Sequence, residues 1–203
     1  MVSSAKENIL KRIRKALSSP VPLPFPQSEG INSVFLPPTE ELEILFAQEF
    51  TRLGGKFAFC TSETDMIEQV KQLLVAREWT KVFCVEEKWN EDLSNTINLE
   101  SCDAAITGCE TLIARTGTIV MSSAQQNGRT VSVYAPVHIC IAYTSQLVYD
   151  VKEGLQALKE KYSLAFPSLI TFASGPSRTA DIEKTLVTGV HGPKEVYCFL
   201  VES

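Results

Sequence analysis

Residues 40–85 read EELEILFAQEFTRLGGKFAFCTSETDMIEQVKQLLVAREWTKVFCV, and this stretch decides the fold class. Apolar residues recur at helical spacing over 40–53 and again over 63–78. A short apolar run follows each segment, KFAFC at 56–60 and KVFCV at 81–85, and each run has the length of a buried strand. This alternation predicts an α/β fold, with a mostly parallel sheet flanked by helices.

Capping residues set the expected ends of these helices. Thr39 is the expected N-cap of the first helix, and Ser62 is the expected N-cap of the second. Gly54 and Gly55 are expected to end the first helix, because glycine adopts the left-handed conformation that follows many helices.

The middle of the chain predicts an inserted β-hairpin region. TGTIVMSS (116–123) and RTVSVYAP (129–136) are rich in strand-forming residues. Asn127-Gly128 between them is a strong hairpin turn signal. Further elements are expected downstream: strands HICIAY (138–143), LITFA (169–173) and EVYCFLVE (195–202), and a helix opened by a capping box of Asp150 and Glu153.

The organisation along the chain has three parts. Residues 1–18 contain an amphipathic helix over 4–17, with apolar residues every four positions and Lys and Arg on the other face. Residues 19–38 form a proline-rich linker, since proline lacks an amide donor and fixes φ. Residues 39–203 form the α/β domain. The first helix is expected either to dock on a partner or to pack on its own domain.

Composition limits the classes of function. The net charge of −5 excludes nucleic acid and anionic membranes as favoured partners. No segment has the roughly 18 apolar residues of a membrane span, and the N-terminus lacks the pattern of a secretory signal. The six cysteines form no CxxC pair, so we expect reduced thiols in a cytoplasmic protein and no iron–sulfur cluster bound by this chain alone.

The densest polar motif follows the expected strand LITFA. Five residues could bind an anion there through main-chain, hydroxyl and guanidinium donors: Ser174, Gly175, Ser177, Arg178 and Thr179. Asp181 and Glu183 are expected in the first turn of a following short helix, where negative charge suits the helix dipole. The alternative interpretation is a structural turn with a local Arg178–Asp181 ion pair.

A second motif is the loop GVHGP at 189–193. It could expose His191 for proton transfer near neutral pH, so His191 is the candidate catalytic residue. The alternative is a histidine hydrogen-bonded within its own loop. His138 lies in an apolar run and is expected to be buried and structural. With two histidines and no HExxH or CxxC pattern, no metal site is expected.

A third motif, Arg115-Thr116-Gly117-Thr118, starts an expected strand and could present hydroxyls to a ligand or form a plain turn. The sequence has no GxGxxG, P-loop or GxSxG motif. We therefore expect no redox cofactor bound by this chain.

Four of these segments resemble, in order, the signature of the LUD-domain family: ARTGTIVM (114–121), NGRTVSVYAPVHICIAY (127–143), GPSRTADIE (175–183) and GVHGP (189–193). The resemblance implies a fold similar to ribose phosphate isomerase, glucosamine phosphate deaminase and CoA transferases. The family usually has an acidic residue where this chain has Arg115. That change favours an anionic ligand over a role for a carboxylate there.

The short members of this family are known as lactate utilization protein C. The resemblance implies a component of bacterial L-lactate oxidation to pyruvate, with Fe–S clusters on partner oxidoreductase subunits. On this hypothesis Arg178 holds a small anion, such as lactate, pyruvate or a phosphorylated compound, and converges with His191 on one cleft. Two alternatives stay open: an enzyme on a small phosphorylated or CoA-linked substrate, with Asp181 or Glu183 as base or nucleophile, and a pure assembly or regulatory module.

Overall fold

The computed structural model describes residues 5–18, 37–38, 40–95, 98–126, 128–179 and 186–203. The chain divides into two units, Met1–Pro37 and Pro38–Ser203. The first unit contains helix α1, Ala5–Leu17. No helix among the described residues is both long enough and apolar enough to cross a membrane.

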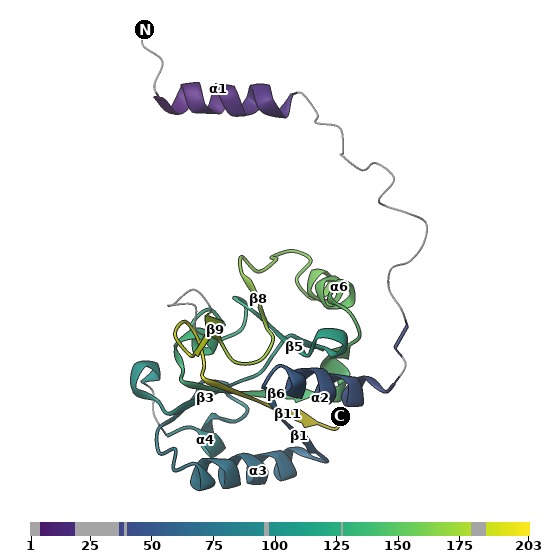
Figure 1. Cartoon of the computed structure of the whole chain (residues 1–203), viewed down its shortest axis with the longest axis vertical. Helices are drawn as coiled ribbons and strands as arrows, with labels where there is room; N and C mark the ends of the chain where they lie inside the picture. Colours follow the sequence, from purple (N-terminus) through teal and green to yellow (C-terminus); the bar gives the residue numbers. More distant parts are fainter. Residues whose placement is uncertain (1–4, 19–36, 39, 96–97, 127, 180–185) are drawn as a thin grey trace. The chain divides into compact units, whose positions relative to one another are not determined.

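The second unit is built on a five-stranded parallel sheet (Figure 1). Its strands, in spatial order, are β1 (Lys56–Cys60), β11 (Glu195–Val201), β6 (Val137–Tyr143), β3 (Ala104–Thr107) and β2 (Val82–Cys84). The inner strands are nearly continuous apolar runs, because a parallel sheet is covered on both faces.

Helices pack on both faces of this sheet, which confirms the predicted fold class (Figure 1). Alternate residues of β6 divide between the two faces, as the pleat of a strand requires. Ile139 packs in the cluster that contains residues of α3 (Glu63–Ala76), whereas Cys140 packs with Phe46 and Phe50 of α2 (Leu42–Arg52).

A second sheet is formed by strands that lie between β3 and β11 in the sequence, on either side of β6. It contains, in spatial order, β7 (Leu147–Val148), β4 (Thr111–Ile113), β5 (Thr118–Ser122) and β8 (Ile170–Ala173). Helix α6 (Val151–Lys161) covers it through Leu158, which packs with Ile113 and Val120. A small antiparallel pair, β9 (Arg178–Thr179) with β10 (Val187–Thr188), follows β8.

One predicted strand was wrong. Residues 129–136 were expected as a strand, but Val131–Tyr134 form the short helix α5. Val131 and Ala135, four residues apart, pack together against Phe83 and Ala105. Strand propensity needs a neighbouring strand to pack on, and both edges of β6 are already paired with β11 and β3. The remaining short helices are α4 (Asn90–Leu93), η1 (Leu99–Ser101), η2 (Ala114–Thr116) and η3 (Thr144–Gln146).

Two predicted caps are confirmed. The Ser62 hydroxyl accepts a hydrogen bond from the Asp65 amide at 3.1 Å. Asp150 and Glu153 form the capping box of α6. Thr39 lies outside the described residues, and the N-cap of α2 is Glu41, which makes no side-chain cap. All six cysteines are free and buried, as the sequence predicted.

Candidate functional site

Two predicted motifs, 116–118 and 174–179, contact the C-terminal end of α2, and the third, 189–193, contacts Ser177. Leu53 is the C-cap of this helix, and Gly54 follows with a left-handed φ of +91°. Gly55 donates its amide hydrogen to the Phe50 carbonyl at 2.9 Å, which closes the turn. The last carbonyls of a helix have no partner within it and carry partial negative charge, so they attract donors and cations.

Arg178 provides that contact. Its guanidinium donates a hydrogen bond from Nη2 to the carbonyl of Leu53, 125 residues away in the sequence. The Arg178 side chain is otherwise exposed, and a guanidinium carries five N–H donors. Arg178 therefore caps α2 through an exposed side chain.

The Thr116-Gly117-Thr118 turn packs against the same end of α2. Gly117 has φ +55°, and a Cβ there would lie 2.4 Å from the Phe50 amide nitrogen. The hydroxyls of Thr116 and Thr118 lie 2.8 Å apart, and Thr118 lies 2.7 Å from the hydroxyl of Ser174. A chain of hydroxyls thus connects two motifs that are far apart in the sequence.

The segment 174–179 differs from its prediction in two ways. The preceding strand, β8, pairs antiparallel with β5 in the smaller sheet, so it does not end at the edge of the parallel sheet. Gly175, with φ +79°, approaches Leu53 so closely that a Cβ would lie 2.8 Å from its carbonyl oxygen. Arg178 and Thr179 form β9. The predicted helix with Asp181 and Glu183 lies outside the described residues.

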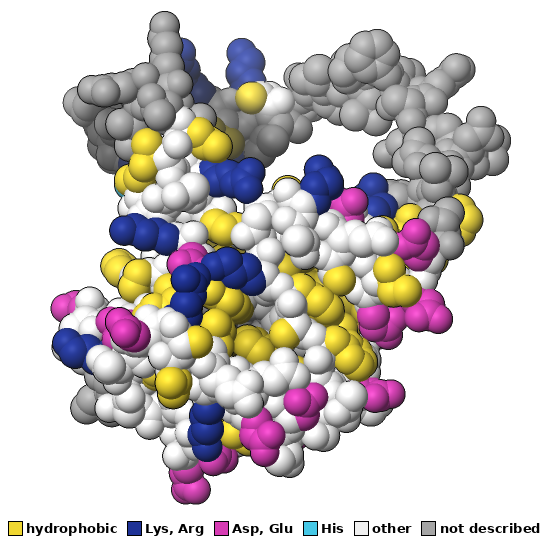
Figure 2. Space-filling view, turned by 60° about the horizontal axis from the view of Figure 1, so that its bottom comes forward, with side chains coloured by type: hydrophobic (Ala, Val, Ile, Leu, Met, Phe, Trp, Pro, Cys, Tyr) yellow, Lys and Arg dark blue, Asp and Glu magenta, His cyan; other side chains and the backbone are white. Residues whose placement is uncertain are grey.

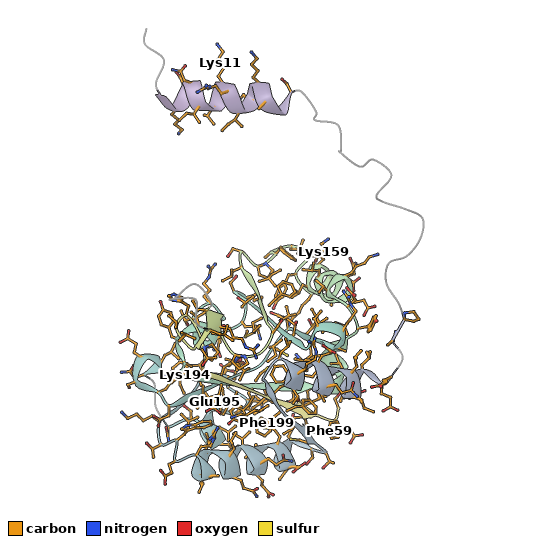
Figure 3. The ribbon with its side chains drawn as sticks, in the orientation of Figure 1. Lys11, Phe59, Lys159, Lys194, Glu195 and Phe199 are labelled. Carbon is orange, nitrogen blue, oxygen red and sulfur yellow. The ribbon has the colours of Figure 1, made fainter. Side chains whose placement is uncertain are left out.

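The two late loops are joined by main-chain hydrogen bonds. The Ser177 amide donates to the Pro193 carbonyl at 2.9 Å, and the Gly189 amide donates to the Ser177 carbonyl at 3.0 Å. A Cβ on Gly192 would lie 2.9 Å from the Ser177 Cβ, so glycine permits this close approach. His191 is exposed on this loop, and Lys194, labelled in Figure 3, follows it directly before β11.

The family described as "LUD domain" matches residues 78–201, more than half of the chain. The chain belongs to the LUD domain family. It is 38% identical over 104 residues to "Lactate utilization protein C" of Deinococcus radiodurans, which covers 51% of this chain and 48% of that relative. It is 28% identical over 158 residues to the protein of the same name in Bacillus subtilis, covering 76% of this chain and 66% of the relative.

The LUD domain chain spans about half the length of the first curated relatives that it matches, 48% and 40%. A solved structure of a DUF162 family protein from Deinococcus radiodurans is similar, with a TM-score of 0.59 and 22% identity. The match covers 81% of this chain and 99% of that chain. It supports the fold described above. The expected relation to ribose phosphate isomerase and CoA transferases stays a prediction.

Arg115, the predicted departure from the LUD domain pattern, forms an ion pair. Its Nε lies 2.5 Å from an Asp150 carboxylate oxygen, and Asp150 also caps α6. The Asp150 side chain is nearly buried, whereas that of Arg115 is 44% exposed. The basic residue thus balances a buried acid at the start of α6.

A buried carboxylate that no sequence motif indicated lies at Glu110. Its side chain is 1% exposed and accepts three hydrogen bonds: from Lys161 Nζ at 2.8 Å, Tyr162 OH at 2.8 Å and Ser122 Oγ at 2.5 Å. These partners tie β4, β5 and α6 together. No local pattern could have found this network, because the partners lie 12 to 52 residues from Glu110.

A second missed cluster lies at the carboxyl edge of the parallel sheet. The Tyr143 hydroxyl donates to Glu63 at 2.6 Å and accepts from Lys88 at 2.6 Å, and Lys88 also pairs with Glu63. Burial, followed by the Glu63 contact, raises the pKa of Tyr143. A phenol with a raised pKa does not serve as a base near neutral pH. We therefore interpret this cluster as a structural contact that links β6, α3 and the loop after β2.

His138 is fully buried, as predicted. Its Nε2 lies 2.8 Å from the Thr107 hydroxyl, and burial lowers its pKa to about 4. It is therefore neutral near pH 7 and has a structural role. Among the described residues, no group of three or more His, Cys, Asp or Glu side chains has the arrangement of a metal site.

Proposed function

We propose that this chain acts in bacterial lactate utilization as a subunit that binds a small anion and carries no redox cofactor of its own. The proposal rests on membership of the LUD domain family and on the names of its relatives. The electrons of lactate oxidation would pass to Fe–S clusters on partner oxidoreductase subunits.

One structural observation supports the location of the anion site. The loops that contain Arg178 and His191 are hydrogen-bonded to each other through Ser177. The exposed Arg178 guanidinium would hold a carboxylate or phosphate, since a guanidinium matches such groups with two parallel hydrogen bonds. The hydroxyls of Thr116 and Ser174 would add polar contacts at one side. The Thr118 hydroxyl, on a 3% exposed residue, bonds to both and would hold them in place.

His191 would be the proton acceptor of this site. Its imidazole is exposed. Oxidation of lactate to pyruvate removes two electrons and two protons, one from the hydroxyl and one from Cα. His191 would accept the hydroxyl proton, and the partner subunits would take up the electrons and the Cα proton. The C-terminal end of α2 has negative polarity, so the attraction for an anion would come from Arg178 and from the hydroxyl and amide donors.

The test combines growth and binding. In the source organism, the gene is replaced by variants Arg178→Lys and His191→Gln, and growth on L-lactate is compared with growth on glucose. Titration calorimetry with lactate, pyruvate and inorganic phosphate measures binding by the purified chain. We expect both variants to lose growth on lactate, and Arg178→Lys to bind the anion at least about tenfold more weakly.

Arg52→Ala is the matched control, because Arg52 is an exposed arginine in the last turn of α2 that pairs with Glu49. It should keep growth and binding. Melting curves of each variant show whether loss of the hydrogen bond between Arg178 and Leu53 has destabilised the fold, which separates that effect from loss of ligand binding. Wild-type growth in both variants, together with no binding of any of the three anions, would reject the proposed site.

The helix α1 favours an additional assembly role. Its apolar residues Ile9, Leu10 and Ile13 are 58%, 39% and 48% exposed. We expect deletion of residues 1–18 to weaken co-purification of the oxidoreductase partners while anion binding is kept. Unchanged co-purification after the deletion would argue against this role.

A further inference from the structure

Strand β1 forms an edge of the parallel sheet. Among the described residues it pairs only with β11, so one row of its main-chain donors and acceptors faces outward. Natural proteins usually protect such an edge with charge, proline, a bulge or a covering segment. Residues 57–60 are Phe-Ala-Phe-Cys, and Phe59 is 45% exposed. Lys56 is the one charged residue of β1, and the rest of the strand, 57–60, lacks the residues that commonly prevent pairing with another strand.

Hollows flank this edge on both faces. A groove of about 680 Å³ lies between β1 and α2 and is lined by Phe57, Phe59 and Ile44. A second groove, of about 380 Å³, lies between β1 and α3. The lower part of Figure 1, where β1 lies, comes forward in Figure 2, and hydrophobic side chains gather in a hollow there. Phe59 and Phe199 on this part of the sheet are labelled in Figure 3.

We propose that β1 is the interface of a two-fold dimer, in which the β1 strands of two copies pair antiparallel. The sequence Phe57-Ala58-Phe59 is the same in both directions. With Ala58 on the two-fold axis, Phe57 of one copy lies opposite Phe59 of the other, on the α2 face. A two-fold contact requires such a self-complementary surface, and aromatic cross-strand pairs stabilise a sheet.

The charges along the edge are arranged to fit this pairing. Helix α2, with 11 residues, and β1, with 5 residues, have matching lengths of about 16 Å and are joined by a tight turn. The start of α2 therefore lies beside the carboxyl end of β1. Three acidic residues line the groove at that end: Glu41, Glu43 and Glu202.

The amino end of β1 has a net positive charge. Arg52, Lys56 and Arg77 lie there with Glu49 and Glu195, so three positive charges face two negative charges, a net charge of +1. Antiparallel pairing places the acidic end of one copy against the basic end of the other. A parallel arrangement would bring like charges together, which opposes association.

The oligomeric state of the full chain tests this proposal. Light scattering after gel filtration should give the mass of a dimer at about 10 µM, the range of a modest interface. Phe59→Lys should weaken the dimer at least about tenfold, because it places a charge opposite an aromatic ring at the interface centre. Phe172→Lys is the matched control, since Phe172 is 42% exposed on β8, an edge strand of the other sheet.

A disulfide tests the register. In an antiparallel pair, facing Cα atoms lie about 4.5–5.5 Å apart, which a disulfide can span. Ala58→Cys should therefore give a covalent dimer on mild oxidation. Val75→Cys, at a 78% exposed position on α3, should not. The native cysteines are buried, so they should contribute little background.

Four results would overturn the proposal: a monomer at all concentrations, a dimer that Phe59→Lys leaves intact, equal loss in Phe172→Lys, or a series of larger assemblies. A dimer in which Ala58→Cys fails to cross-link would exclude the two-fold register. The inference is independent of the proposed lactate role, because no residue of the anion site takes part.

Discussion

Gly117 gives the sharpest prediction about the region around α2. Its φ of +55° lies in the left-handed region, where a residue with a Cβ costs about 1–2 kcal/mol. A Cβ would also lie 2.4 Å from the Phe50 nitrogen and 2.7 Å from the Glu49 carbonyl carbon. Both atoms belong to the main chain of a packed helix and cannot move aside as a flexible side chain could.

The expected cost of Gly117→Ala follows from these two effects. Overpacking a tight site costs about 1–3 kcal/mol, so together with the cost of the left-handed φ the free energy of unfolding should fall by about 2–5 kcal/mol. A domain is stable by about 5–15 kcal/mol, so the variant should fold but melt roughly 4–20 °C lower. Urea denaturation followed by circular dichroism measures the change directly.

Gly108→Ala is the control for this variant. A Cβ at Gly108 would meet its nearest neighbour, the Trp89 ring, at 3.7 Å, which is ordinary contact. Its effect should stay within about 1 kcal/mol of wild type. If Gly117→Ala unfolds within about 1 kcal/mol of wild type, the close packing of this turn on α2 is refuted.

Three further predictions concern buried charge. Burial lowers the pKa of His138 to about 4, below its unfolded value of about 6.5. Between these pH values the unfolded chain binds more protons than the folded chain. The free energy of unfolding should therefore fall by up to about 3 kcal/mol as the pH drops from 6.5 to 4. Urea titrations of His138→Gln should lack this slope, and an unchanged slope would assign it to other groups. Asp150→Ala should lower the free energy of unfolding by about 1–2 kcal/mol, because the cap of α6 is lost. Arg115→Ala should lower it by less than about 1 kcal/mol, because the arginine is 44% exposed. Equal destabilisation of the two variants in thermal melts would contradict this. Glu110→Ala should lower the free energy of unfolding by about 2–4 kcal/mol, because it leaves the buried Ser122 hydroxyl and the half-buried Tyr162 hydroxyl without an acceptor. Lys161→Ala, at a 60% exposed side chain, should lower it by about 1 kcal/mol. The reverse order would refute the assignment of Glu110 as the centre of the network.

Local patterns were enough to predict much of the fold. The two helices and two strands of residues 40–85 follow from apolar spacing, and each was found close to its expected bounds. The caps at Ser62 and Asp150 depend on residues within three positions, so the sequence alone determines them. Burial of His138 and of the cysteines follows from the apolar runs that contain them.

The tertiary structure decided what depends on which surfaces meet. Strand propensity did not prevent Val131–Tyr134 from forming a helix, because the sheet offered no free neighbour there. The partners of Glu110 could not be predicted either, because they lie 12 to 52 residues away and reach Glu110 only after the elements that contain them have packed.

The candidate site shows the same division. The sequence identified Thr118, Ser174 and Arg178 as polar residues in glycine-containing segments. Only the fold brought the Thr118 and Ser174 hydroxyls together and placed Arg178 on the last carbonyl of α2. Apolar periodicity and caps act over a few residues, whereas contacts across 56 or 125 residues exist only after the two sheets and α2 have packed.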